Sequence, residues 1–205
     1  MQTSLSPLQI KKLVDYLSQY SKAPISELKN VITQLDIVKK NKGNTLINQG
    51  EPIAYCYFIV EGCVRQFTID EEGEEITVDF LCEHQADAIF DLPEMNTSSP
   101  YTFECMDDCI LIAGDLNTEE TLYEAYPFLK QLIMNMLQTF LSKRIDASVQ
   151  HLSKSPLQRY QNLLQSHALI LDLVPQHQIA SYLGITPESL SRIKRRMSLN
   201  EQPNA

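Results

Sequence analysis

A stretch near the C-terminus, from Val174 to Arg196, places the strongest constraint on what this chain can fold into. It predicts two short helices joined by a tight turn at Gly184, because glycine tolerates the left-handed conformation in which many helices end. The first helix has apolar residues at helical spacing that are expected to face inward, namely Ile179, Ala180 and Leu183. Its polar residues are expected to face outward, namely Gln176, Gln178 and Ser181.

The second predicted helix has a well-marked beginning and a polar outer face. Thr186 is a favourable N-cap, Pro187 fits the first helical position, and Glu188 complements the positive end of the helix dipole. Leu190 and Ile193 are expected to face inward. A short helix, a turn and a polar helix rich in basic residues together predict a helix-turn-helix, which is typical of DNA-binding proteins. The alternative is a helical hairpin within some other core.

The charge of the chain is unevenly distributed. The net charge is −9 over 205 residues, which by itself argues against a nucleic-acid partner. Residues 151–205, however, hold six basic and three acidic residues, a net of +3, whereas residues 1–150 hold 11 basic and 23 acidic residues, a net of −12. This asymmetry indicates an acidic body with a nucleic-acid-facing end, so we expect DNA contact to be confined to the C-terminal part.

Composition narrows the class of protein further. With 43% hydrophobic residues the chain can bury a sizeable core of one or two domains. It has no run of about 18 apolar residues and no secretory leader, so we expect a cytoplasmic protein without a membrane span. The five cysteines lack metal-ligand spacing and suit a reducing compartment, where their default role is as small core residues.

The pattern of the chain is helical over residues 5–34, with an interruption at Pro24, and then changes to β. Short strand-like runs separated by turn residues are found at 37–40, 45–48, 56–60, 64–69, 75–81, 101–105 and 110–113. The segment Asp70–Gly73 predicts a hairpin turn within this series. Many short strands at such spacing predict a small barrel, roll or jelly roll.

A long helix is predicted to connect the strands to the helix-turn-helix. A short helix at 116–126 precedes Pro127, and apolar residues then recur every three or four positions up to Leu152. This stripe is wider than a coiled-coil seam requires, so it could cover the roll on one side and a twin helix on the other. The candidate dimer residues are Leu129, Leu132, Ile133, Met136, Leu137 and Phe140. The alternative is an ordinary core helix within one subunit.

The runs Lys42–Glu51 and Tyr57–Arg65 resemble the cyclic-nucleotide-binding β-roll of the Crp/Fnr regulators, and with the helix-turn-helix the resemblance extends over about residues 5–196. It implies an α+β fold: an N-terminal β-roll (a double-stranded β-helix or jelly roll), a long dimerisation helix and a C-terminal helix-turn-helix. The corresponding domains are 1–126, 127–152 and 153–205. The implied function is that of a homodimeric bacterial transcription factor, with double-stranded DNA and RNA polymerase as partners.

Family members that bind cyclic nucleotides use a Gly-Glu pair for the ribose and an Arg-Ser pair for the phosphate. In this chain Asp91 falls near the position of that Glu, and Ser99-Pro100 falls where Arg-Ser is expected. Arg and Lys are absent between Arg65 and Lys130, whereas acidic residues in this stretch would repel an anionic ligand. We therefore expect a degenerate effector pocket that does not bind cyclic AMP; an uncharged effector, or none, remains open. The candidate pocket residues are Arg65, Asp91, Ser98, Ser99 and Tyr101.

Metal and catalytic chemistry find little support in the sequence. The Fnr-type members hold an iron–sulfur cluster through N-terminal cysteines, but here the first cysteine is Cys56. Only one histidine, His84, falls in the strand region, whereas a cupin-like metal site needs paired histidines. We expect no metal, no cofactor and no catalytic residues. A β-roll enzyme or scaffold stays as an alternative, as does a true cyclic-nucleotide regulator with an unusual phosphate-binding loop.

The resemblance also implies how DNA is read, because the family's recognition helix carries a Glu near its start and an Arg four residues later. Glu188 and Arg192 match this pattern and would lie on one helix face, where Glu can accept from cytosine and Arg can bind guanine. The alternative is that Glu188 only favours the helix dipole and Arg192 only pairs with it. Further candidate DNA contacts are Gln176, Gln178, Thr186, Ser189, Ser191, Lys194, Arg195 and Arg196.

Two departures from the family bear on DNA recognition. Pro187 stands where the best-known members often have Arg, so one base contact is lost and a different operator is expected. Only nine residues follow Arg196, too few for the usual hairpin wing, which is either absent or cut short. The expected operator is two-fold symmetric, with half-sites about one helical turn apart.

Overall fold

The strands form two antiparallel sheets that make a β-roll, in a computed structural model that describes residues 4–83, 98–115, 119–166 and 170–200. One sheet has the order β1-β7-β3 and the other the order β2-β6-β4-β5. The strands are β1 (Asp36–Lys40), β2 (Thr45–Ile47), β3 (Tyr55–Glu61), β4 (Val64–Ile69), β5 (Glu75–Leu81), β6 (Thr102–Cys105) and β7 (Cys109–Asp115). Each predicted strand agrees with the structure within two residues at either end, and the α+β class is confirmed.

The interior of the roll is a cluster of apolar side chains from both sheets. Successive side chains along a strand point to opposite faces of the sheet, so each strand contributes part of its residues to this interior. Val64 and Leu81, paired across β4 and β5, both point into this cluster. Its other buried members are Ile47, Ile59, Phe103, Cys105, Cys109 and Leu111. Burial of these side chains supplies the hydrophobic free energy that closes the two sheets on each other.

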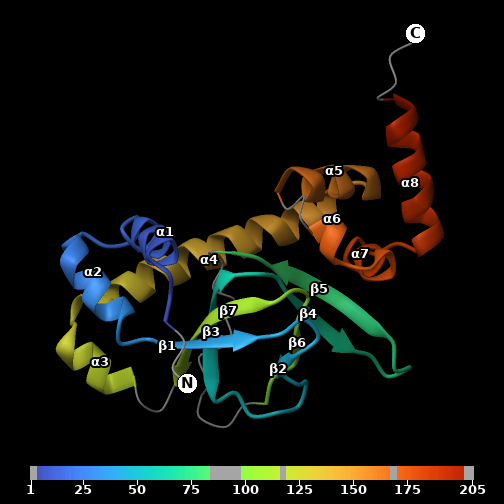
Figure 1. The fold of residues 1–205 in the computed structure, drawn as a ribbon. Helices are drawn as coiled ribbons and strands as arrows, with labels where there is room; N and C mark the ends of the chain where they lie inside the picture. The colour runs from blue at the N-terminus through green and yellow to red at the C-terminus, as the bar shows by residue number, and fades with distance from the viewer. Residues whose placement is uncertain (1–3, 84–97, 116–118, 167–169, 201–205) are drawn as a thin grey trace.

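Two N-terminal helices and the first half of a long helix cover the β1-β7-β3 sheet (Figure 1). They are α1 (Pro7–Leu17), α2 (Ile25–Ile32) and α4 (Phe128–Ser153), with α3 (Glu119–Ala125) before α4. α1 begins in a capping box, in which Ser6 Oγ accepts from the Gln9 amide and Gln9 accepts from the Ser6 amide. Buried leucines of α1 and α2 meet Val60 of β3 and Leu132 of α4 in one cluster.

The long helix is apolar on two sides, and the structure corrects the predicted dimer residues. Leu129, Leu132, Met136 and Phe140 are buried within the protomer, three of them against α1 and α2, so the core-helix alternative holds for this half. Ile133 and Leu137 are half-buried, and Ile133 packs against the same cluster. The exposed apolar residues of α4 are instead Met134, Leu141, Ile145, Val149 and Leu152. The sequence stripe combined both sides because their spacings overlap.

The C-terminal helices gather at the other end of α4, above the hairpin of β4 and β5 (Figure 1). They are α5 (Pro156–Ser166), α6 (Ile170–Leu173), α7 (Gln176–Tyr182) and α8 (Pro187–Asn200). Their own core joins three roll residues, Cys63, Phe80 and Met106, in one continuous cluster. The roll and the C-terminal helices of a protomer therefore share buried surface.

The turn between β3 and β4 depends on a glycine at a point of close approach. Gly62 has a φ of 104°, and a Cβ there would lie 2.7 Å from Cys109 Sγ and 2.8 Å from the Asp108 carbonyl oxygen. Gly73 has a φ of 85° but open space around it. Substitution at Gly73 therefore tests the cost of backbone strain alone, whereas substitution at Gly62 adds the cost of steric overlap.

We expect Gly73→Ala to cost roughly 1 kcal/mol of unfolding free energy, because only the left-handed conformation is penalised. Gly62→Ala should cost about 1–3 kcal/mol more, because it also overpacks the turn. Urea unfolding of both variants measures the difference. Equal losses would show that the contact at Gly62 relaxes freely.

Candidate nucleic-acid interface

The predicted helix-turn-helix is present as α7, a tight turn and α8. Gly184 adopts the left-handed conformation with a φ of 63°. The Ile185 amide donates to the Ala180 carbonyl at 3.0 Å, and Arg159 Nη2 donates to the Leu183 carbonyl at 2.7 Å. These bonds satisfy carbonyl groups that the end of α7 leaves open. Arg159, a basic residue of the C-terminal part, thereby stabilises the motif and lies partly buried.

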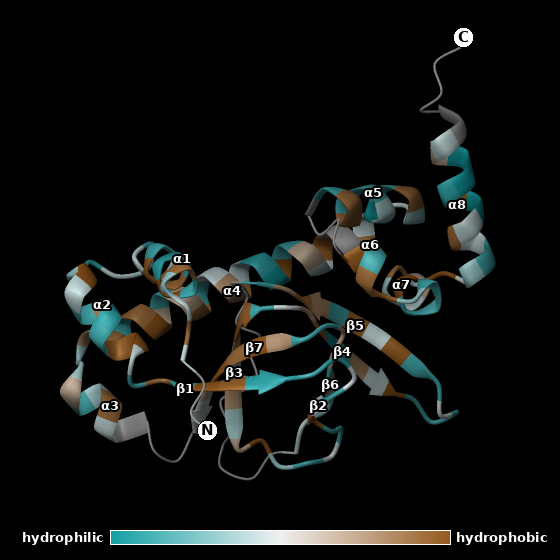
Figure 2. Cartoon of the chain, viewed as in Figure 1, coloured by the Kyte–Doolittle hydropathy of each residue, from teal (hydrophilic) through white to brown (hydrophobic). Residues whose placement is uncertain are grey.

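The start of α8 follows the sequence prediction. Thr186 Oγ1 accepts from the Ser189 amide at 3.3 Å, as an N-cap does. Leu190 is buried and Ile193 half-buried against α7 and its neighbours, which leaves the opposite side open. Figure 2 shows that α8 is mostly hydrophilic. The exposed residues on it and at its cap are Thr186, Pro187, Glu188, Ser191, Arg192, Arg195, Arg196 and Ser198, while Ser189 and Lys194 are partly exposed.

Glu188 and Arg192 share this exposed side. A hydrogen bond with its own backbone amide lowers the pKa of Glu188, helped by Thr186 and by the positive charge of Arg192. The carboxylate is thus ionised at neutral pH and has the acceptor character that an exocyclic amino group of a base requires. The helix-dipole role also applies, since Glu188 lies in the first turn. Both side chains are nevertheless open to a ligand.

The first helix of the motif differs from its prediction at two residues, Gln178 and Ser181. Gln176 is exposed, but Gln178 is only 9% exposed, and its Oε1 has no hydrogen-bond partner among the described residues. The prediction that Gln178 faces DNA was wrong, because α7 packs against both β5 and α8 and little of its circumference stays open. The sequence pattern of α7 alone could not reveal the second packing partner.

That packing partner is β5, the outer strand of its sheet. Ser181 Oγ accepts from the Thr77 amide at 2.9 Å and donates to the Glu75 carbonyl at 3.3 Å. Beside it, the rings of Phe80 and Tyr182 meet edge to face with centroids 5.4 Å apart. Burial raises the pKa of Tyr182 to about 12, so its hydroxyl stays neutral. We call these contacts the α7–β5 contact.

Arg65 lies under the α7–β5 contact rather than in the roll interior. It is paired with Phe80 across the strands, on the face opposite Val64 and Leu81, and is 1% exposed. Its Nη1 forms an ion pair with Glu75 at 2.5 Å, and its Nε donates to Thr77 Oγ1 at 2.9 Å. Its placement in the effector pocket was therefore wrong, because strand alternation turns it outward.

The remaining predicted pocket residues serve the roll itself. Buried Ser99 exchanges hydrogen bonds with the backbone of Tyr101, at 2.7 and 3.2 Å. Tyr101 packs partly buried against the interior cluster, and exposed Ser98 forms an isolated bridge with Pro52. Asp91 lies outside the described residues. The structure thus keeps Ser99 and Tyr101 together but does not join Arg65 to them.

A cation that sequence reasoning missed reaches the inner side of the roll from α4. Arg144 Nη2 donates to Gln66 Oε1 at 2.7 Å and lies 3.8 Å from Asp79 Oδ2. Gln66 and Asp79 are paired across β4 and β5, on the same face as Val64. The nearest signal in the sequence was an arginine that interrupts the apolar stripe of the long helix. Its partner Asp79 balances its charge.

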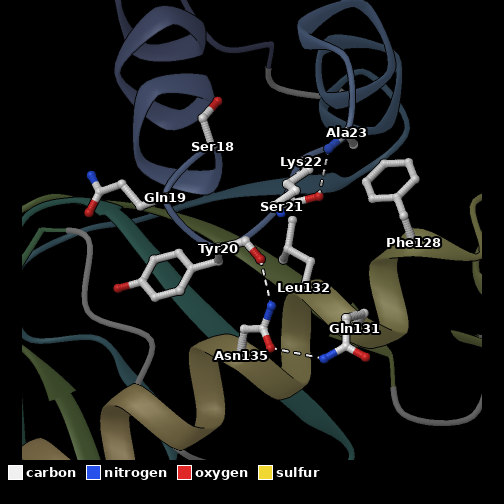
Figure 3. Close-up of a pocket in the computed structure, with 10 residues that line it drawn as sticks. All are labelled: Ser18, Gln19, Tyr20, Ser21, Lys22, Ala23, Phe128, Gln131, Leu132 and Asn135. Atoms are coloured by element: carbon white, nitrogen blue, oxygen red, sulfur yellow. Dashed lines mark hydrogen bonds between the residues drawn. The ribbon is translucent and has the colours of Figure 1, made fainter.

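A surface hollow of about 640 Å³ lies between the α1–α2 connection and the start of α4 (Figure 3). Within it, Asn135 Nδ2 donates to the Tyr20 carbonyl at 2.8 Å and Gln131 Nε2 donates to Asn135 Oδ1 at 2.9 Å. Leu132, a predicted dimer residue, lines the hollow, but none of the predicted DNA-binding or effector-pocket residues does. Within the described ranges, no cluster of three or more His, Cys, Asp or Glu could hold a metal, and no helix has the length and apolarity to cross a bilayer.

Comparison with known proteins supports the roll and the order of the elements. Residues 37–126 match the family described as cyclic nucleotide-binding domain. The chain is 24% identical to Electron transport regulator A of Shewanella oneidensis over 185 residues, which cover 80% of this chain and 71% of that relative. It is 25% identical to the Anaerobic regulatory protein of Pasteurella multocida over 191 residues, covering 84% of this chain and 66% of that relative.

Solved structures show the same fold. The c-di-GMP-responsive global regulator CLP of Xanthomonas campestris superposes with a TM-score of 0.67 at 12% identity, covering 89% of this chain and 95% of CLP. FixK2 from Bradyrhizobium japonicum superposes with a TM-score of 0.63 at 18% identity, covering 83% and 89%. At these identities the likeness concerns the fold. The chain spans about two thirds of the length of the Pasteurella relative.

Proposed function

We propose that this chain, whose fold and relatives are those of the Crp/Fnr-type transcriptional regulators, regulates transcription by binding DNA in a sequence-specific way as a homodimer. The observation that carries the proposal is the open face of α8, which presents an ionised Glu188 and Arg192 side by side. Such relatives are regulators rather than enzymes. The cytoplasm as location and RNA polymerase as a further partner belong to the same proposal.

The residues of α8 divide into two roles. Glu188 and Arg192 read base edges in the major groove, where a carboxylate accepts from cytosine and a guanidinium donates to guanine. Arg195 and Arg196, further along the same open side, neutralise phosphates and supply affinity without sequence information. Thr186, Ser189, Ser191, Lys194 and Gln176 are the remaining contact candidates. Burial removes Gln178 from this group.

The proposed dimer forms through the second half of α4 and brings together the two copies of α8 that a symmetric operator requires. Leu141, Ile145 and Val149 are large apolar residues spaced four positions apart, and all are exposed in the protomer. A contiguous apolar stripe on an isolated subunit is what a self-complementary helix pair covers. Two copies of α8 would then meet two half-sites of a symmetric operator about one helical turn apart.

The effector pocket of this regulator is proposed to be degenerate, with no cyclic AMP bound. Arg65 is occupied by Glu75 and faces away from the roll interior, and Arg144 is balanced by Asp79. A cyclic phosphate would have to displace one of these carboxylates, at a cost in charge-assisted hydrogen bonds. A second candidate is a true cyclic-nucleotide regulator, which is favoured by the domain match over residues 37–126 and by Arg144 on the inner face.

DNA recognition is tested by selecting bound sequences from a random duplex library and then measuring the Kd of the wild type and variants. Arg192→Ala should cost on the order of 1–3 kcal/mol and relax one base position. Arg195→Ala should weaken binding to all sequences and reduce the slope against salt by about one. Lys29→Ala on α2 is the charge-matched control and should change neither. No preference of the wild type over random duplex contradicts the proposal.

Dimerisation is tested by the solution mass of two variants matched for exposure. Ile145→Glu should give a monomer, because a buried charge at a helix pair has no partner there. Leu8→Glu, on α1, should stay dimeric, since Leu8 and Ile145 are both 64% exposed in the protomer but only Ile145 lies on the proposed seam. Sedimentation equilibrium distinguishes the two. A dimeric Ile145→Glu would place the interface elsewhere.

The effector proposal is tested by titration calorimetry with cyclic AMP and cyclic GMP. We expect no binding of either in the micromolar range, because both nearby guanidinium groups are already paired. Micromolar binding that is lost in Arg144→Gln would instead establish the second candidate.

A further inference from the structure

Four of the five cysteines lie at one corner of the roll, where β4 and β7 begin and β5 and β6 end. The Sγ atoms of Cys63 and Cys82 are 3.7 Å apart. The register of β4 and β5 pairs Val64 with Leu81, so Cys63 and Cys82 occupy the next opposed positions just beyond the two strands. Directly opposed residues have Cα atoms about 4.5–5.5 Å apart, which falls within the range that a disulfide bridges.

The two thiols differ in access. Cys63 is 1% exposed, whereas Cys82 is partly exposed. The hydrogen bond between them lowers the pKa of Cys82 and raises that of Cys63, and burial raises the latter further. Cys105 and Cys109 are close to one another as well, but both are buried. The pair of Cys63 and Cys82 therefore combines an approachable sulfur with a protected one.

The same pair adjoins the C-terminal helices. Cys63 belongs to the cluster that joins Phe80 and Met106 of the roll to the core of the helix-turn-helix, and Cys82 packs against that cluster. Phe80, two residues before Cys82, forms the edge-to-face ring contact with Tyr182 that is part of the α7–β5 contact. Any displacement of these sulfurs is thus transmitted to the surface on which α7 rests.

We propose that Cys63 and Cys82 form a modification site, at which a peroxide converts the two thiols into a reversible disulfide that loosens the α7–β5 contact. The inference concerns the regulation of this chain and stands apart from the identity of its operator. Disulfides that form transiently in a reducing compartment are characteristic of redox-responsive proteins.

The chemistry needs only the peroxide as oxidant. The Cys82 thiolate attacks one peroxide oxygen and the O–O bond breaks, which gives a sulfenic acid and a hydroxide that takes up a proton as water. Cys63 sulfur then attacks Cys82 Sγ, and the S–O bond breaks as the S–S bond forms. The expelled hydroxide takes the Cys63 proton and leaves as a second water. Two thiols and one peroxide give one disulfide and two waters, and a dithiol restores the thiols by exchange.

The mechanical effect follows from close packing. The sulfurs must approach from 3.7 Å to a bond length of about 2.05 Å, so both side chains leave their packed positions. A packed cluster tolerates such shifts poorly, because neighbouring side chains lose contacts or rotamers. We expect the α7–β5 contact to loosen and the orientation of α8 to become more variable.

The experiment treats the full-length protein with hydrogen peroxide and combines peptide mapping with hydrogen exchange. The expected result is a cross-linked peptide pair containing Cys63 and Cys82, with amide exchange in α7 faster by about threefold or more. Dithiothreitol should reverse both changes. Cys82→Ser should show neither, whereas Cys56→Ser, a partly exposed cysteine on β3, should respond as the wild type does.

Two outcomes would overturn the proposal. The first is that peroxide treatment cross-links only Cys105 to Cys109, or produces no cross-link at all. The other is a Cys63–Cys82 cross-link that leaves the exchange of α7 unchanged. Neither readout involves DNA, so the proposal can fail while the DNA-binding function holds, and the reverse.

Discussion

The arrangement of this molecule depends on how the outer strand β5 satisfies its open edge. A strand at the margin of a sheet leaves amide and carbonyl groups without a neighbour in the ladder. Here Ser181 of α7 bonds to the Thr77 amide and the Glu75 carbonyl. This hydroxyl and the apolar cluster around Phe80 together hold the helix-turn-helix on the roll, and the orientation of α8 depends on both. Arg65, beneath this contact, stiffens it by holding Glu75 and Thr77.

Local signals in the sequence were sufficient to predict the strands and the helix-turn-helix. The strands alternate with period two between glycine-containing turns, and α8 begins with a cap, a proline and an acid, so their limits depend on nearby residues. The misplaced residues have a different cause. Gln178 is covered because a strand about 100 residues earlier packs on its helix, and Leu129 to Phe140 are covered by the N-terminal helices. Such partners leave no trace in the periodicity of one segment.

In the candidate effector region, the positions of the charged side chains could likewise not be predicted from single segments of the sequence. Counting cations along the strands missed Arg144, which arrives from α4 and is separated from Gln66 by 78 positions. It also overvalued Arg65, whose strand position turns it away from the interior. Both guanidinium groups have carboxylate partners, so the charge on the two faces of β4 and β5 is locally balanced. A ligand there must compete with an intramolecular partner, which is a stricter condition than electrostatic attraction alone.

The edge position of β5 has a consequence for solubility. If the C-terminal helices leave the roll, Thr77 and its neighbours regain a row of unpaired backbone groups that another chain can extend as a sheet. Exposed Ile76 and Val78 on this strand would favour such intermolecular association. Glu75 and Asp79 flank them and act as charged gatekeepers against aggregation. The chain is thus most prone to self-association when its C-terminal helices have left the roll.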